Sequence, residues 1–251
     1  MQSALIGYTG FVGSNLAEQQ LFTHYYNSHN IEAIVNQEFD LVVCAGVSGV
    51  KWLANQDPLK DWQNIQRLID CLQTILTAKF VLISTVDVYY LPINVDEDTV
   101  IELEKLKPYG KHRRQLEIFV ESTFNCLIIR LPGLFGKNLK KNIIYDLLNN
   151  NRVENINPDS LYQFYHLEDL TKDIEIGLDQ RSSLINFATE PVTAREVAEH
   201  IFEKELKIQL DTDIARYDMR SKIWQNNQRG YLYNKQQILL KLKEFVAQYQ
   251  Q

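Results

Sequence analysis

The sequence predicts a doubly wound α/β fold, a parallel sheet covered by helices on both faces, with a small C-terminal lobe. Short apolar runs alternate with amphipathic segments along the first half of the chain. The runs are continuously apolar, as at residues 40–46, which is typical of strands buried on both faces. Gly7, Gly10 and Gly13 follow the first run and precede a helical pattern. This order indicates a tight strand-to-helix turn.

The elements of the first half follow from these patterns. Residues 4–6 form a buried central strand, and Val12, Leu16 and Ala17 give the following helix its apolar face. Further strands are expected at 22–26, 40–46, 80–85 and 126–130, and helices at 59–76 and after Pro108. The stretch 28–39 is short, so we expect that crossover to contain only a turn or so of helix.

The second half is less regular after Gly136. We expect helices at 142–151, 193–206 and 236–249, and strands at 161–167 and 183–188. There is no repeat, low-complexity tract or obvious linker. We therefore divide the chain into a sheet domain, residues 1–136, and a lobe, residues 137–251, interleaved with returning elements of the sheet domain.

Composition excludes several classes of protein. The chain has 251 residues, with 26 basic and 32 acidic side chains and a net charge of −6, which argues against a nucleic-acid partner. No apolar run approaches the roughly 20 residues that span a bilayer. The N-terminus leads directly into a strand, so we expect no signal peptide, no membrane partner and a cytoplasmic location. Cys44, Cys71 and Cys126 lie far apart in apolar or helical patterns, which predicts buried free thiols and no metal site.

The glycine segment is the first candidate site. Gly7 permits a sharp turn, Gly10 lets the backbone approach a phosphate, and Gly13 lets the helix pack closely on the sheet. The N-terminus of such a helix can hold a phosphate group. The spacing differs from the common G-x-G-x-x-G, so a purely structural turn is the alternative on this segment alone.

Two later segments complete a pattern. Ser84, Thr85 and Tyr89 lie at or just after the end of the fourth strand, and Tyr109 and Arg113 open a helix. With the glycine segment, they resemble the extended branch of the short-chain dehydrogenase/reductase family, which contains nucleotide-sugar epimerases, dehydratases and reductases. Further matches to the family are Ala45-Gly46, Asn64, residues 130–136 and residues 166–169.

The resemblance implies a Rossmann-type fold, with residues 1–136 binding a dinucleotide and 137–251 forming the substrate lobe. It implies an NAD(P)-dependent oxidoreductase, epimerase or dehydratase acting on a nucleotide-linked sugar, with a possible homodimer. The residues that would bind the cofactor are Gly7, Thr9, Gly10, Phe11, Val12, Gly13, Asn27, Ser28, Ala45, Gly46, Asn64 and Pro132. Those that would bind the substrate are Lys140, Asn142 and Arg220, although a solvated basic loop explains Lys140 equally well.

The resemblance also implies the catalytic roles. Tyr109 would be the acid/base and Thr85 the hydroxyl that orients the substrate oxygen, preferred over Ser84 because it lies four residues before Tyr89. A tyrosine with a pKa of about 10 is a poor base at neutral pH unless a nearby cation stabilises its phenolate. In the family a lysine four residues after the tyrosine does this.

This chain departs from the family at that lysine, because the position holds Arg113. Lys111 lies two residues from Tyr109 and so faces away on a helix, whereas Arg113 shares its face. Arginine keeps the charge but cannot lose a proton. Two interpretations are open: an enzyme that works with arginine, or a protein that has lost catalysis and only binds the dinucleotide.

The choice between NAD and NADP depends on the end of the second strand. Asn27 and Ser28 lie there, with neither the carboxylate typical of NAD binding nor an arginine for the NADP phosphate. Because nothing there would repel a phosphate, we favour NADP. A plain turn is equally compatible.

The strand at 162–166 lacks the arginine that sugar-nucleotide enzymes often place at its start, and His166 fits a packed strand residue.

Overall fold

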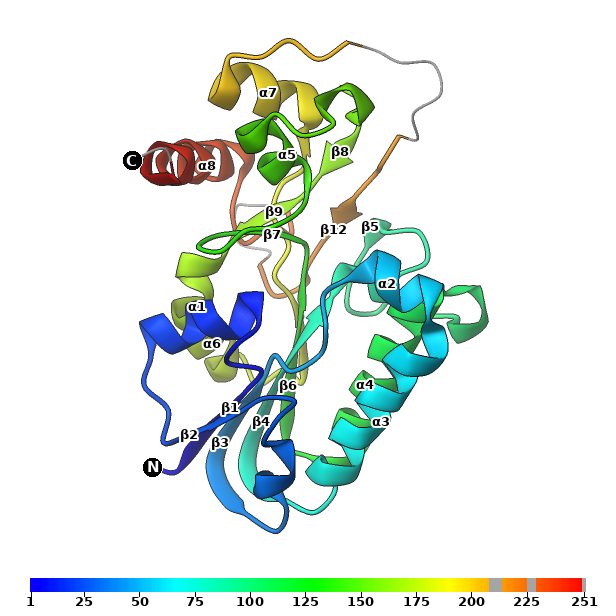
Figure 1. Ribbon diagram of the computed structural model, residues 1–251, viewed down its shortest axis with the longest axis vertical. Coiled ribbons are helices and arrows are strands. Elements are labelled where there is room, and N and C mark those ends of the chain that lie inside the picture. Colours follow the sequence, from blue (N-terminus) through cyan, green and yellow to red (C-terminus); the bar gives the residue numbers. More distant parts are fainter. Residues whose placement is uncertain (208–213, 225–228, 250–251) are drawn as a thin grey trace. The chain divides into compact units, whose positions relative to one another are not determined.

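The structure is a computed structural model that describes residues 1–207, 214–224 and 229–249 (Figure 1). It forms two compact units, and the chain passes between them several times. Unit 1 consists of Met1–Leu91, Thr99–Arg130 and Glu168–Ile185. Unit 2 consists of Pro92–Asp98, Leu131–Leu167 and the described residues of Asn186–Gln251. The division at residue 136 stays a prediction from the sequence.

A six-stranded parallel sheet is the framework of unit 1, and the predicted Rossmann-type doubly wound fold is confirmed. Its order is β10-β6-β4-β3-β1-β2. The strands are β1 (Ser3–Ile6), β2 (His24–Tyr26), β3 (Glu38–Cys44), β4 (Leu76–Thr85), β6 (Cys126–Leu131) and β10 (Leu184–Asn186). The inner strands are apolar and buried, as their continuous apolar runs predict.

Helices cover both faces of this sheet. α1 (Phe11–Gln19) and α6 (Leu170–Asp179) lie on one face, and α3 (Pro58–Leu72) and α4 (Pro108–Thr123) on the other, with α2 (Lys51–Gln56) before α3 (Figure 1). Both long helices begin at a proline, whose fixed φ suits the first turn. The predicted helix 59–76 ends at Leu72, and Leu76 instead begins β4.

The connection between β2 and β3 is a single 3₁₀ turn, η1 (Ile31–Ile34), as the short stretch predicts. β2 and β3 pair with opposite edges of β1. The strand order therefore reverses between β1 and β3. In open parallel sheets, ligands bind at such a switch point, outside the carboxyl ends of the strands.

Unit 2 contains three two-stranded ladders. These pair β5 (Ile93–Val95) with β12 (Asp218–Met219), β7 (Gly133–Phe135) with β9 (Phe164–His166), and β8 (Leu161–Tyr162) with β11 (Val192–Thr193). Its helices are α5 (Ile143–Asn149), α7 (Ala194–Phe202) and α8 (Lys235–Tyr249). Short 3₁₀ turns elsewhere in the chain are η2 (Val86–Val88), η3 (Leu103–Lys105), η4 (Val153–Asn155) and η5 (Leu167–Asp169). None of the helices in the described ranges is long and apolar enough to cross a membrane.

The strand predicted at 161–167 is divided at Gln163 into β8 and β9. The Gln163 side chain is buried, donates to the carbonyl of Met219 at 2.8 Å and accepts from the Met219 amide at 2.7 Å. A side chain that bonds another strand in this way satisfies main-chain groups that a regular ladder would otherwise pair.

Candidate functional site

The carboxyl ends of three strands of unit 1 meet at one edge of the sheet. Ile6 of β1 is opposite Cys44 of β3, and Cys44 is opposite Leu82 of β4. The glycine turn after β1, the Ala45-Gly46 segment after β3 and Thr85 at the end of β4 therefore lie along the same edge. This edge includes the β1/β3 switch point.

The glycine turn depends on the absence of side chains. Gly7 has a φ of +87°, and a Cβ on it would lie 2.4 Å from the carbonyl oxygen of Ala45. A Cβ on Gly13 would lie 2.1 Å from the carbonyl oxygen of Gly7. Real atoms cannot approach so closely, so only glycine allows α1 to pack against the turn. The Gly10 amide donates to Gly7 O at 2.9 Å and closes the turn.

The first turn of α1 fits a phosphate group. Gly10 is the N-cap, no side chain caps this end, and no acidic residue lies in the first turn. The amides of Phe11, Val12 and Gly13 belong to the group that has no acceptor within a helix. Gly10 and Thr9 are exposed beside them. Free amides and the positive end of the helix dipole form a ready anion site.

The residues at the end of β2 form a hydrogen-bonded turn. Asn27 accepts from the His29 amide at 2.8 Å, and the Asn27 amide donates to the side chain of Asn30 at 2.7 Å. Ser28 is exposed. The side-chain oxygen and the main-chain amide of Asn27 are thus both bonded within the turn.

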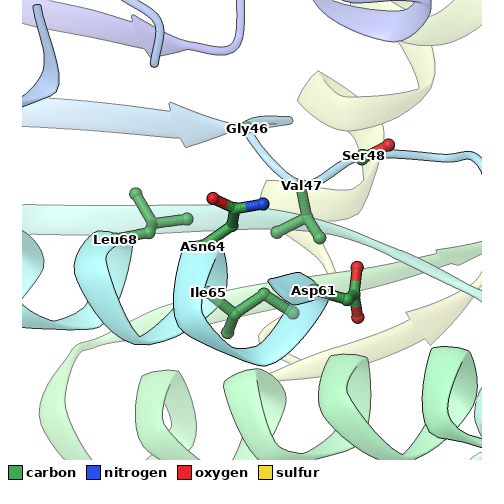
Figure 2. Close-up of a pocket in the computed structure, with 7 residues that line it drawn as sticks. All are labelled: Gly46, Val47, Ser48, Asp61, Asn64, Ile65 and Leu68. Carbon is green, nitrogen blue, oxygen red and sulfur yellow. The ribbon is translucent and has the colours of Figure 1, made fainter. Parts of the chain in front are cut away.

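A small pocket adjoins the β3 end. It is lined by Gly46, Val47, Ser48, Asp61, Asn64, Ile65 and Leu68. Figure 2 shows the Asn64 amide on α3 pointing toward the Gly46–Val47 segment. Two of the predicted cofactor residues, Gly46 and Asn64, therefore lie together, and Ala45 adjoins them, its amide bonded to Ile6 O at 2.9 Å.

Thr85 and Tyr109 are brought together at the end of β4. The Thr85 hydroxyl lies close enough to the Tyr109 side chain to lower its pKa, and it also accepts from the Asp87 amide at 3.2 Å. The Tyr109 amide donates to the side chain of Asn55 at 3.0 Å. A Cβ on Gly110 would lie 2.1 Å from the carbonyl oxygen of Asp87, so glycine after the tyrosine is what lets α4 approach this segment.

Tyr109 is buried, and burial raises the pKa of its hydroxyl above the ordinary value of 10.0. Arg113 lowers that pKa, the Asp87 carboxylate raises it, and Thr85 and Lys51 lower it. The net direction is upward. A positive charge beside the ring is present, as the position of Arg113 predicts, but it does not outweigh desolvation.

Arg113 is itself buried, with 5% of its surface exposed, and its donors are committed. It donates to Asp61 Oδ2 at 2.5 Å and Oδ1 at 3.0 Å, and to Ser48 O at 2.6 Å. Its guanidinium carbon lies 3.9 Å from the centre of the Tyr109 ring. It also donates to the Tyr109 carbonyl at 3.2 Å. The guanidinium therefore contacts the ring face and main chain of Tyr109.

Asp61 also meets His112 Nδ1 at 2.7 Å. Lys111 turns away from this cluster, to Glu104 at 3.2 Å, in agreement with its helical spacing. Sequence reasoning missed Asp61, Ser48 and Asn55 as neighbours of the site. Asp61 and Arg113 are 52 residues apart, and no local pattern connects positions on different helices.

A second charged cluster lies one turn further along α4. Glu117 is fully buried and accepts from Arg130 at 2.7 and 3.0 Å, from Arg114 at 2.9 Å and from Ser84 at 2.5 Å. Arg130 also donates to the hydroxyl of Tyr89 at 2.8 Å. Burial lowers the pKa of Arg130, but its bonds to Glu117 and the charge of Glu117 raise that pKa by a larger amount. Arg130 therefore stays ionised.

The remaining predicted residues lie in unit 2. Pro132 is buried and Lys140 is exposed. Asn142 caps α5, accepting from the amides of Ile144 and Tyr145 and donating to Leu134 O at 2.8 Å. Arg220 pairs with Asp218 at 2.8 Å. The side chains of Asn142 and Arg220 thus already have partners within unit 2.

Comparisons with known proteins establish the fold. No family model matches the sequence, and no curated protein sequence matches it. A dTDP-4-dehydrorhamnose reductase from Clostridium acetobutylicum is similar in structure, with a TM-score of 0.76 and 14% identity over 100% of both chains. RMD from Pseudomonas aeruginosa complexed with NADPH gives 0.76 and 16% over 99% of both chains. A UDP-N-acetylglucosamine 4-epimerase from Methanobrevibacter ruminantium, in complex with UDP-N-acetylmuramic acid, gives 0.75 and 14%, over 99% of this chain and 97% of that one. At these identities the similarity is one of fold.

Proposed function

We propose that the protein is an NAD(P)-dependent oxidoreductase or epimerase of the extended short-chain type that acts on a nucleotide-linked sugar. The observation that carries this proposal is that the Thr85 hydroxyl lies close to the Tyr109 side chain, on the edge that holds the glycine turn. Structural neighbours that are nucleotide-sugar epimerases and reductases, one of them complexed with NADPH, support it.

The cofactor would lie along the carboxyl edge of the sheet. The amides of the first turn of α1 would hold its diphosphate, beside Thr9 and Gly10. Asn27 and Ser28 would meet the adenosine ribose, where the absence of a carboxylate favours NADP. Ala45, Gly46, Asn64 and Pro132 complete the proposed set of cofactor residues.

A bound nicotinamide would supply or accept the hydride. Thr85 orients the substrate oxygen, and Tyr109 gives a proton to that oxygen or takes one from it. The raised pKa of Tyr109 keeps its hydroxyl protonated at neutral pH, which suits proton donation to a carbonyl that is being reduced. Arg113 holds a fixed positive charge against the tyrosine ring.

Substrate recognition would involve unit 2. Lys140 is the strongest candidate for a substrate phosphate, because it is an exposed cation. Asn142 and Arg220 would contribute mainly by shaping their loops, since each already has partners. A homodimer, implied by the family resemblance, stays a prediction that sedimentation would check.

The test begins with mass spectrometry of the nucleotide that co-purifies with the protein. Tyr109→Phe should retain dinucleotide binding and lose about 10²-fold or more in turnover, as expected for a general acid/base. Gly10→Val should weaken dinucleotide binding itself, because a side chain at this exposed position would block the diphosphate. Tyr90→Phe, at an exposed neighbouring tyrosine, is the matched control and should change neither.

A second function is a non-catalytic dinucleotide-binding protein, a sensor or assembly partner. The observation that favours it is that both terminal nitrogens of Arg113 already bond Asp61 and main-chain carbonyls. In that case Tyr109→Phe would leave every measurable function intact while Gly10→Val would not. Failure of both cofactors to bind would contradict both functions.

A further inference from the structure

We infer that Lys51 is a positioning residue for Tyr109, which reaches the end of β4 from α2 through its ion pair with Asp87. It would supply the lysine that the chain lacks four residues after the tyrosine. This inference rests on the proposed function for its catalytic meaning, but its electrostatic part concerns side chains of unit 1 alone.

Arg113 differs in its chemistry from the lysine that the resembling family has at this position. Its guanidinium is buried, bonds both oxygens of Asp61 and the Ser48 carbonyl, and lies over the tyrosine ring. It is a fixed charge that cannot be released without unpairing Asp61, and it cannot lose a proton. A second cation near Tyr109 that is not locked in buried bonds would therefore be able to adjust the proton affinity of the tyrosine.

An ion pair with Asp87 holds Lys51 near the end of β4. Its Nζ lies 2.5 Å from Asp87 Oδ1. The main chain of Asp87 is bonded through its amide to Thr85 and lies against Gly110, the residue after Tyr109. The carboxylate that anchors Lys51 thus belongs to the same small cluster as the two proposed catalytic hydroxyls.

The charges of this cluster act on Tyr109 in opposite directions. Arg113 lowers the pKa of Tyr109, Asp87 raises it, and Lys51 lowers it to a smaller extent. Lys51 is 45% exposed and Asp87 19%, so the pair can exchange with solvent or meet a ligand, unlike Arg113. The pair can therefore adjust the proton affinity of Tyr109, whereas Arg113 only sets a constant background.

The test replaces Tyr109 with a trifluorinated tyrosine, whose hydroxyl ionises near neutral pH, and follows its phenolate absorbance against pH. In that background Lys51→Met should raise the pKa of the phenol by about 0.5 or more, because a nearby positive charge is lost. Lys51→Arg should restore it. Adding Asp87→Asn to Lys51→Met should lower the pKa again, which general loosening of the site would not do.

Lys111→Met is the matched control, since Lys111 is paired with Glu104 and should leave the titration unchanged. If Lys51→Met gives the same titration as Lys111→Met, the inference is wrong. In the natural-tyrosine protein, Lys51→Met should move the pH profile of kcat by the same amount while the KM for the cofactor stays within about twofold. A shifted titration without any turnover would reject the proposed function and leave the electrostatic inference standing.

Discussion

Two charged clusters on α4 differ in what they connect. Glu117, Arg130 and Ser84 join α4 to β4 and β6 in an enclosed network whose ion pair is almost fully buried. Arg113, Asp61 and His112 join α4 to α3 and to the loop after β3, and contact Tyr109. Arg113 and Glu117 are four residues apart and share a helix face. One face thus carries an enclosed cluster between α4 and the sheet and, a turn nearer the N-terminus, a cluster that contacts Tyr109.

The largest effect on stability is expected at Glu117. Glu117→Gln removes the carboxylate that neutralises Arg130, leaving a charge in the interior, and we expect a loss of about 3–5 kcal/mol in the free energy of unfolding. Urea denaturation measures it. Glu121→Gln, at a partly exposed partner of Arg114, should change stability by less than about 0.5 kcal/mol. Equal effects of the two variants would mean that the Glu117 network is not structural.

Asp61→Asn should cost less stability than Glu117→Gln, about 1–3 kcal/mol, because Arg113 keeps its bonds to the Ser48 and Tyr109 carbonyls. It should instead reduce turnover, since the guanidinium would no longer be fixed on the tyrosine ring. Urea denaturation and kcat measured on the same samples separate the two effects. A larger loss of stability than in Glu117→Gln would reverse the comparison.

Stability at alkaline pH depends on Tyr109, whose folded-state pKa is raised by burial. Below pH 10 the hydroxyl is protonated in both states, so its contribution to stability is fully present. As pH rises from 10 through the folded pKa, the unfolded chain loses the proton first, and stability falls. Thermal melts of the wild type between pH 9 and pH 11 (a range of about two pH units around the ordinary tyrosine pKa) should decline more steeply than those of Tyr109→Phe. Tyr90→Phe should follow the wild type.

The smallest effect is expected at Lys111, which neither cluster uses. Its partner Glu104 is 89% exposed, so the pair is solvated. Lys111→Ala should change the free energy of unfolding by less than about 0.5 kcal/mol and leave kcat unaltered. A loss comparable to that of Asp61→Asn would place Lys111 inside the site cluster and contradict its assignment to the surface.

Much of the fold was predictable because its signals are local. The apolar runs of β1, β3, β4 and β6, the short η1 crossover and the prolines that begin α3 and α4 each act within a few residues. The short strands β5, β7, β11 and β12 were not predicted. They contain two or three residues each and exist only because a partner distant in sequence pairs with them, as Asp218 does with Ile93.

For the candidate site, local sequence patterns were enough to identify which groups could act: the glycines that α1 requires, a hydroxyl at the end of β4, and a tyrosine at the start of α4. Helical spacing also determined that Arg113, and not Lys111, shares the face of Tyr109. The contacts that these groups make depend on the tertiary structure. Asp61 neutralises Arg113, and Lys51 meets Asp87, across 52 and 36 residues of chain. Charge pairing depends on distance in space, and only folding brings residues of α2, α3, η2 and α4 within reach of one another.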